Sequence, residues 1–429
     1  MSTTFQRIIR CSWFVVVGIM VLCTSLIVRA DSDTITLEVI LNSWQQEIID
    51  VIKAGISRFE EANPGINVEV RQRGTWDDVV VRIVSGVAPD ILSVDAVRTA
   101  EMAQSGVLME LDDLIAQFQL EPKILPAMWD NAKMNGRTYS VPALESGPRA
   151  GMLWNKDMVN EAGLAVNPDE ALTWPEFLDY ADKLTRINAD GSVERIGFDP
   201  RNGQNTSLNN IEPLWNAMWL NHDTHLPQLD SPEFVQGFEL LTERVYQKYP
   251  AFGGSDGWYV ISTQKVATTM LGSYAPRTIQ TTNPGINLLT TWSPHVDGMK
   301  TQRLFSWGLA IPVGAEYPEI SMRLIEFLAT DVEFQLDLFS AVGWMGAGID
   351  LYGVLPDYID DPATMWYVRS LAEAEITTAH YPHPALGTAQ RLFNAAKNKI
   401  FNLEEPADNA LKEANRLLLA EMERDGLIP

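Results

Sequence analysis

Cysteine is nearly absent from this sequence of 429 residues, which contains only Cys11 and Cys23. Both cysteines lie within the first 30 residues, so a chain cleaved after Ala30 would have no disulfide. Small exported domains depend on disulfides, whereas a chain of this length can bury enough apolar surface to fold without them. The cysteine pattern therefore excludes a small disulfide-stabilised module.

Basic residues are also scarce, with 32 Lys and Arg against 56 Asp and Glu. The first 30 residues contain three arginines and no carboxylate, so the remaining chain has a formal charge of 29 − 56 = −27. Such a surface repels nucleic acid and anionic lipid, and it favours solubility. Neither nucleic acid nor a membrane surface is expected as a partner.

Nucleotide-binding loops are missing as well, because no Walker or dinucleotide fingerprint occurs. We expect no cofactor and no ATP hydrolysis by this chain. Residues 253–257 (Gly-Gly-Ser-Asp-Gly) match a nucleophile elbow, but no buried strand precedes them. His222 with His225, and His380 with His383, have a spacing that could hold a metal on a helix, yet prolines interrupt the second pair. We therefore expect neither a catalytic serine nor a metal site.

The amino terminus differs from the rest of the chain. Arg7 and Arg10 precede an apolar run over residues 13–28, and Val28-Arg29-Ala30 has the form of a signal-peptidase site. We interpret residues 1–30 as a cleaved export signal that sends the protein to the periplasm. The alternative is an uncleaved membrane anchor, because the run approaches the length that spans a bilayer.

Strand and helix patterns alternate through the first third of the chain. Alternating apolar residues predict strands at 34–41 and 66–70 and a buried strand at 90–94, and helical periodicity predicts helices at 45–62, 77–85 and 99–106. This order is typical of a parallel sheet covered by helices.

The later parts of the chain contain more helix. We expect a mainly helical region over 174–249 with a hairpin turn at 188–191, then a strand at 304–312, a helix at 320–329 and a helical end at 389–424. No long Gly/Ser or Pro linker occurs, so two lobes would be joined by short strands.

Four sequence stretches carry a resemblance to a known family. They are Phe-Glu-Glu-Ala-Asn-Pro-Gly-Ile at 59–66, Gly-Val-Ala-Pro-Asp-Ile at 86–91 followed by Gln-Ser-Gly-Val-Leu at 104–108, Asn-Gly-Arg-Thr-Tyr-Ser-Val-Pro at 135–142 followed by Leu-Trp-Asn-Lys-Asp at 153–157, and Trp-Gly-Leu-Ala-Ile-Pro at 307–312 followed by Ile-Glu-Phe-Leu at 325–328. Their order resembles the maltose-binding-protein-like solute-binding proteins (extracellular family 1) over nearly the whole chain after the signal. Trp154 and residues 264–270 depart from the family pattern.

The resemblance implies an α/β, two-lobed periplasmic-binding-protein fold of type II, with an interlobe cleft and a hinge that closes on ligand. The implied boundaries are 1–30 for the signal, 31–142 with 304–348 for the N-terminal lobe, and 143–303 with 349–429 for the C-terminal lobe. The implied function is that of a monomeric receptor, not an enzyme, which captures a sugar or oligosaccharide and delivers it to the permease subunits of an ABC importer.

Aromatic residues supply the first candidates for ligand contact. The sequence has 13 tryptophans, and flat rings pack against the apolar faces of sugar rings. We select the four that lie beside predicted strand ends or crossings: Trp44, Trp76, Trp307 and Trp344. Each of them could instead be a core residue.

Polar candidates come from the same regions. Asp95 follows the predicted strand at 90–94, at the edge where open parallel sheets bind ligands. The resemblance places Glu145, Tyr274 and Arg277 near the cleft. Arg277 could pair with an anionic group of a ligand, or it could form a surface or interlobe salt bridge.

Two alternative functions stay open. The same fold could receive a polyamine, an amino acid or a glycerophosphodiester. An exported carbohydrate-active hydrolase or lyase would also be acidic and rich in tryptophan, but it requires a pair of carboxylates across its cleft. Assays of sugar-polymer turnover would distinguish the enzyme from the receptor.

Overall fold

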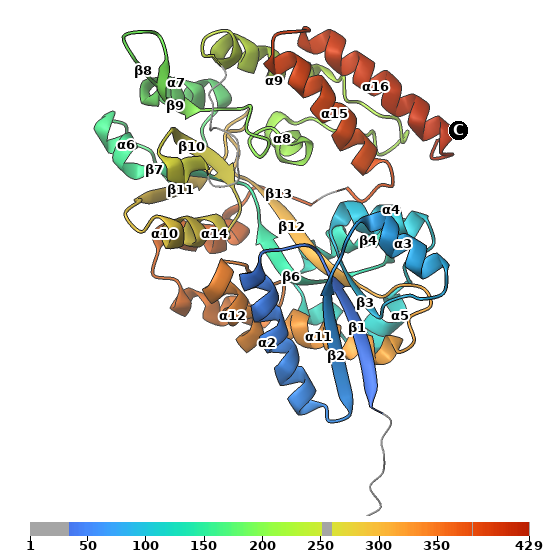
Figure 1. Cartoon of the computed structure of the whole chain (residues 1–429). Helices are drawn as coiled ribbons and strands as arrows, with labels where there is room; N and C mark the ends of the chain where they lie inside the picture. The colour runs from blue at the N-terminus through green and yellow to red at the C-terminus, as the bar shows by residue number, and fades with distance from the viewer. Residues whose placement is uncertain (1–33, 251–259, 380, 429) are drawn as a thin grey trace, which may run out of the picture.

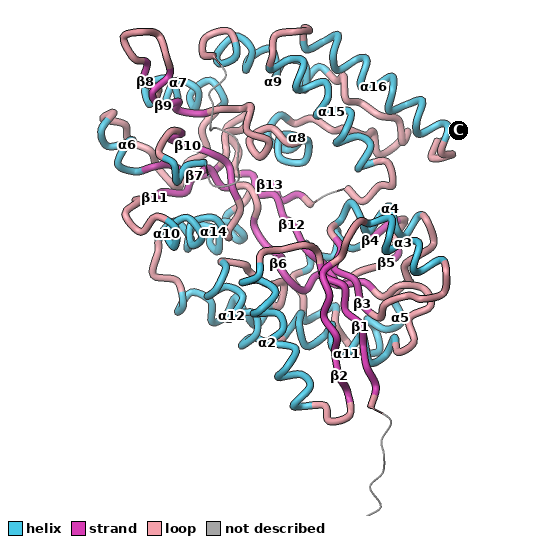
Figure 2. The backbone as a smooth tube through the Cα atoms, viewed as in Figure 1, coloured by secondary structure: helices cyan, strands magenta, loops and turns pink. Residues whose placement is uncertain are grey.

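The computed structural model describes residues 34–250, 260–379 and 381–428, which form two α/β lobes (Figure 1). Figure 2 shows a separate group of strands in each lobe, with helices around it. The predicted signal at 1–30 and the serine motif at 253–257 lie outside the described residues. Within these ranges, no helix combines the length and the apolar character that crossing a membrane requires.

The first-lobe sheet has the strand order β13-β12-β3-β1-β2, and β6 also pairs with β12. Its strands are β1 (Ile35–Leu41), β2 (Ile66–Gln72), β3 (Ile91–Val94), β6 (Val141–Pro148), β12 (Thr301–Ala310) and β13 (Ile376–Thr378). The first three are parallel, as the alternation of strands and helices predicts. β3 lies inside the sheet and is wholly buried, whereas β2 at the edge alternates between half-buried and exposed residues.

The second-lobe sheet has the order β11-β7-β10-β9-β8. Its strands are β7 (Gly151–Asn155), β8 (Arg186–Ile187), β9 (Val193–Phe198), β10 (Val266–Leu271) and β11 (Leu288–Trp292). The helical region expected at 174–249 therefore contains the β8–β9 hairpin, and the turn predicted at 188–191 is confirmed as its connection. A separate short hairpin, β4 (Lys133–Met134) and β5 (Arg137–Thr138), belongs to the first lobe.

Two antiparallel strands, β6 and β12, run between the lobes (Figure 1). Their register pairs Leu304 with Pro148 and Leu309 with Val141. A hydrogen bond of 2.8 Å between the hydroxyls of Ser146 and Ser306 joins them at mid-length. The lobes are thus connected by sheet structure rather than by a flexible linker; their sequence limits stay a prediction.

Helices cover both sheets. In the first lobe they are α2 (Gln46–Ala62), α3 (Trp76–Val84), α4 (Ala96–Gln104), α5 (Asp112–Gln117), α11 (Pro318–Thr330) and α12 (Val332–Val342); the others are α6 (Lys156–Glu161), α7 (Trp174–Leu184), α8 (Leu208–Trp215), α9 (Pro232–Leu241), α10 (Ala275–Thr282), α13 (Ile349–Val354), α14 (Pro362–Glu373), α15 (Leu386–Phe401) and α16 (Ala407–Arg424). The predicted helices occur within a few residues of their expected positions. α4 begins at Ala96 rather than at residue 99, because the Asp95 carboxylate caps it by accepting a 2.9 Å hydrogen bond from the Arg98 amide.

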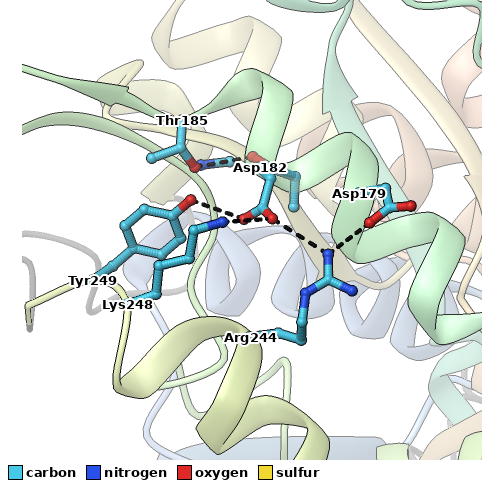
Figure 3. A network of polar contacts seen from close by, with 8 residues as sticks. Asp179, Asp182, Thr185, Arg244, Lys248 and Tyr249 are labelled. Carbon is cyan, nitrogen blue, oxygen red and sulfur yellow. Dashed lines mark hydrogen bonds and ion pairs between the residues drawn. The ribbon is translucent and has the colours of Figure 1, made fainter.

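A polar network holds the second-lobe helices together, and Figure 3 shows it from close by. The Asp182 carboxylate on α7 accepts hydrogen bonds from Arg244 (3.3 Å), Lys248 (2.7 Å) and the Tyr249 hydroxyl (2.8 Å). Burial opposes ionisation of Asp182, but the bonds from Lys248, Tyr249 and Arg244 hold its pKa below the usual value. The carboxylate is therefore ionised and stabilises the contact of α7 with the chain that follows α9.

Candidate ligand-binding cavity

A cavity of about 420 Å³ lies where β6 and β12 meet the ends of elements from both lobes. We call it the Trp44 cavity, and its lining residues are Asn42, Trp44, Gln45, Ile48, Glu145, Arg149, Tyr274, Trp307 and Trp344. Five of the eight predicted site residues are among them. The structure thus brings together residues that are separated by up to 300 positions in the sequence.

Three tryptophans form one wall of this cavity. The Trp44 ring centroid lies 5.1 Å from that of Trp307 and 5.1 Å from that of Trp344, with nearly perpendicular planes in both pairs. Trp44 and Trp307 are half-buried, and Trp344 is 6% exposed. The pairing of β6 with β12 shifts register between Ser306 and Gly308, so Trp307 lies at an irregularity of the kind that redirects a side chain.

A buried ion pair forms a second part of the wall. Glu145 on β6 accepts a short hydrogen bond from Arg149, and their side chains are 7% and 10% exposed. The Arg149 guanidinium lies 4.8 Å from the ring centroid of Tyr274 and 4.3 Å from that of Phe305. A Cβ at position 272 would lie 2.9 Å from the Cδ atom of Arg149, so Gly272 permits this close approach. The arginine is held in one orientation by its aromatic neighbours.

Two further ionisable residues, Arg303 and Glu212, lie behind this pair. The Arg149 amide donates a 2.7 Å hydrogen bond to the carbonyl of Arg303 on β12. Burial lowers the pKa of Arg303 to about 9, and repulsion from the nearby Arg149 charge is a smaller cause in the same direction. Burial raises the pKa of Glu212 on α8 to about 8. Ionisable groups are therefore desolvated where the strands pass between the lobes, so their charges depend on the local packing.

Trp76 and Asp95 lie outside the Trp44 cavity, in a polar cluster of the first lobe. The Trp76 ring lies beneath the guanidinium groups of Arg73 (4.6 Å) and Arg98 (5.4 Å). Burial raises the pKa of Asp95, which caps α4. The cluster reaches the cavity through the 2.8 Å hydrogen bond that Arg73 Nε donates to Asn42 Oδ1. Ligand contact by Trp76 and Asp95 stays a prediction.

Arg277 also lies outside the Trp44 cavity. Its Nε donates a 2.6 Å hydrogen bond to the carbonyl of Ser340, and its guanidinium lies 5.7 Å from the ring centroid of Phe339. These contacts connect α10 to α12. Neither contact is the salt bridge that was the alternative expectation for Arg277, and ligand contact by Arg277 stays a prediction.

Four of the lining residues are not among the predicted site residues, namely Asn42, Gln45, Ile48 and Arg149. Asn42 and Gln45 lie within two residues of Trp44 in the sequence, and this proximity could have predicted them as lining residues. Arg149 follows Glu145 by four residues near the predicted crossing. Its direction depends on contacts with Tyr274 and Phe305, which are distant in sequence.

Three other cavities formed by the described residues contain none of the predicted site residues. One of about 560 Å³ lies within the first lobe and is lined in part by Asp112, Trp129 and Thr138. Another, of about 460 Å³, lies between the lobes and is lined in part by His225 and His383. We favour the Trp44 cavity because it combines aromatic rings, a buried ion pair and residues of both crossing strands. Across the described parts of the chain, no group of three or more His, Cys, Asp or Glu is suited to hold a metal.

The family model for bacterial extracellular solute-binding proteins matches residues 42–333, more than half of the chain. This chain belongs to that family. Its match to the maltotriose-binding protein of Pyrococcus abyssi is 21% identical over 210 residues, which is 48% of this chain and 43% of the relative's length.

Solved structures share the fold of this solute-binding protein. CpMnBP1 with mannobiose bound has a TM-score of 0.77 at 18% identity, covering 90% of this chain and 100% of the other. The ABC substrate-binding protein Lmo0181 from Listeria monocytogenes, in complex with cycloalternan, has a TM-score of 0.77 at 18% identity, covering 91% and 100%. A solute-binding protein from Thermotoga lettingae bound to α-D-tagatose has a TM-score of 0.73 at 20% identity, covering 90% and 99%. These matches confirm the expected two-lobed α/β fold.

Proposed function

We propose that this protein is the periplasmic receptor of an ABC importer and that the Trp44 cavity holds a sugar or oligosaccharide. The observation that carries the proposal is the pairing of the tryptophan wall with the Glu145–Arg149 ion pair in one cavity. Indole faces suit the apolar faces of sugar rings, and the charged pair suits their hydroxyls. The names of the relatives, which include maltotriose and mannobiose binding, support the same solute class.

Capture rather than bond cleavage is the proposed activity. Glycoside hydrolysis uses two carboxyl groups on opposite sides of the scissile bond. Among the described residues that line the Trp44 cavity, Glu145 supplies the carboxylate, and it is engaged by Arg149. Delivery of the solute to permease subunits, action as a monomer and export through residues 1–30 belong to the same proposal.

A thermal-shift screen tests the solute class. Mature protein is melted with neutral mono- and oligosaccharides, polyamines, amino acids and glycerophosphodiesters, each over a concentration series. A solute at about 100 times its Kd should add about 2.7 kcal/mol of stability. Stabilisation by a sugar that Trp344→Ala reduces supports the proposal, whereas stabilisation by a polyamine or an amino acid alone contradicts it.

A further inference from the structure

The 460 Å³ cavity between the lobes has its own set of ligand-type side chains, and we call it the His383 cavity. The first lobe contributes Gln104 at the end of α4 together with Lys133 and Asn135 of the β4–β5 hairpin. The second lobe contributes Tyr381 and His383 to the lining. Its volume is in the range of small-molecule sites and similar to that of the Trp44 cavity.

Three aromatic rings lie nearly parallel on the second-lobe side. Tyr381 stacks on His222 with ring centroids 4.0 Å apart and planes 18° apart, and its plane is 17° from that of His383. Trp219 contacts His383 edge to face at 5.5 Å, and His383 Nδ1 accepts a 3.1 Å hydrogen bond from the Ala385 amide. These rings are therefore held in place by packing within the second lobe.

Helix α4 contacts α15 of the second lobe just before the end of α4 that lines this cavity. Val97 of α4 packs against the hydrophobic core of the second lobe. Gly387 of α15 lies so close to Glu101 that a Cβ at that position would collide with the carboxylate. Gln104, which lines the His383 cavity, is one helical turn beyond Glu101. The lining residues of the two cavities also do not overlap, so we treat them as separate sites.

We propose that the His383 cavity is a second carbohydrate site. A sugar ring would pack against the part of the Tyr381 ring that lines the cavity, while the amides of Gln104 and Asn135 and the Lys133 ammonium form hydrogen bonds with its hydroxyls. The inference rests on the proposed function, because it assigns the same solute class. Since both lobes line this site, its occupancy is linked to their relative position.

Histidine-ring NMR with mannobiose and maltotriose tests the inference, because the lining of the Trp44 cavity contains no histidine. The titrations use wild type and Trp344→Ala, the latter to weaken the first site. We expect the His225 and His383 signals to shift in both proteins. His295, whose ring bonds to Asn216 at 3.1 Å, provides an internal reference.

Calorimetry of the same sugars counts the sites. We expect two binding events in wild type and one in Tyr381→Ala, whereas Tyr381→Phe retains both within about tenfold of the wild-type Kd. Tyr358→Ala is the matched control, since Tyr358 is 54% exposed and lines neither cavity. Melting curves verify that each variant is folded.

The outcomes separate the two proposals. One binding event that Trp344→Ala weakens and Tyr381→Ala leaves unchanged overturns the second site and preserves the proposed function. Absence of binding by both sugars in wild type contradicts both. A Tyr381→Ala variant that keeps two events, or shifts of His225 and His383 that survive in it, also overturns the second site.

Discussion

The tryptophans of the Trp44 cavity and those of the second-lobe core make similar ring contacts in different surroundings. Trp44 contacts Trp307 edge to face at 5.1 Å, and Trp174 contacts Trp215 in the same manner at 6.0 Å. Trp174 is 1% exposed and donates from Nε1 to the Leu214 carbonyl at 3.4 Å, whereas Trp44 and Trp307 are half-buried beside an open volume. Contacts between aromatic rings therefore do not identify a ligand site by themselves. The open volume beside the rings of Trp44 and Trp307 distinguishes them from the core tryptophans.

The largest expected effect is a loss of stability on truncation of a core tryptophan, Trp174. Trp174→Ala removes a fully buried indole that packs against Phe177 and Phe198. Loss of its burial and the resulting cavity should lower the free energy of unfolding by about 3–5 kcal/mol. Denaturant titration measures this change. The sugar affinity of the folded fraction should be preserved, and a large fall in that affinity with little loss of stability would reverse the assignment.

Trp307→Ala should have the opposite signature. Its ring is half-buried at the Trp44 cavity, so truncation should weaken sugar binding by about 1–3 kcal/mol while the fold persists. Calorimetry and melting temperature are measured on the same preparation. Unchanged affinity together with a large fall in melting temperature would place Trp307 with the core tryptophans.

The sequence was sufficient for the parts of the fold that depend on local periodicity. Strands β1 and β3, helix α2 and the crossing at β12 occur near their predicted positions because apolar spacing determines them. The choice of tryptophans beside predicted strand ends and crossings also selected Trp44 and Trp307, which line the Trp44 cavity. It also selected Trp76, whose ring lies beside the guanidinium groups of Arg73 and Arg98 outside the Trp44 cavity, and ligand contact by Trp76 stays a prediction.

The missed residues depend on tertiary contacts. Arg149 faces the Trp44 cavity because Tyr274 and Phe305, more than 100 residues away, hold its guanidinium there. Periodicity contains no information on such a contact. The β8–β9 hairpin was missed as a pair of strands although its turn was recognised, because β8 has only two residues and gives no alternation.

A medium effect is expected for the polar network in Figure 3, which stabilises the second lobe without an open cavity beside it. Asp182→Asn removes a carboxylate that accepts three hydrogen bonds, two of them from cations, and should cost about 1–2 kcal/mol at pH 7. Because the folded-state pKa of Asp182 is lowered, the stabilisation is present above its ordinary pKa of about 3.9 and is lost as the pH falls through the folded value.

Unfolding of wild type and Asp182→Asn as a function of pH measures this dependence. The difference in stability should be constant above about pH 5 and should shrink below about pH 4. Sugar affinity should not change at pH 7. A stability difference that persists at low pH would mean that the carboxylate charge is not the source of the stabilisation.

The smallest expected effect on sugar affinity is that of Arg277→Ala, and Arg149→Lys is its comparison, because both arginines lie over aromatic rings. Arg277 bonds to the Ser340 carbonyl and lies over Phe339, away from the Trp44 cavity, so Arg277→Ala should change sugar affinity by less than about 0.5 kcal/mol. Arg149→Lys keeps the charge but loses the planar group that faces Tyr274 and Phe305, so it should weaken binding by more than tenfold. Calorimetry on both variants measures which of the two arginines contributes to sugar affinity. Equal losses would show that α10 takes part in binding, and the Trp44 cavity would then be too narrow a definition of the site.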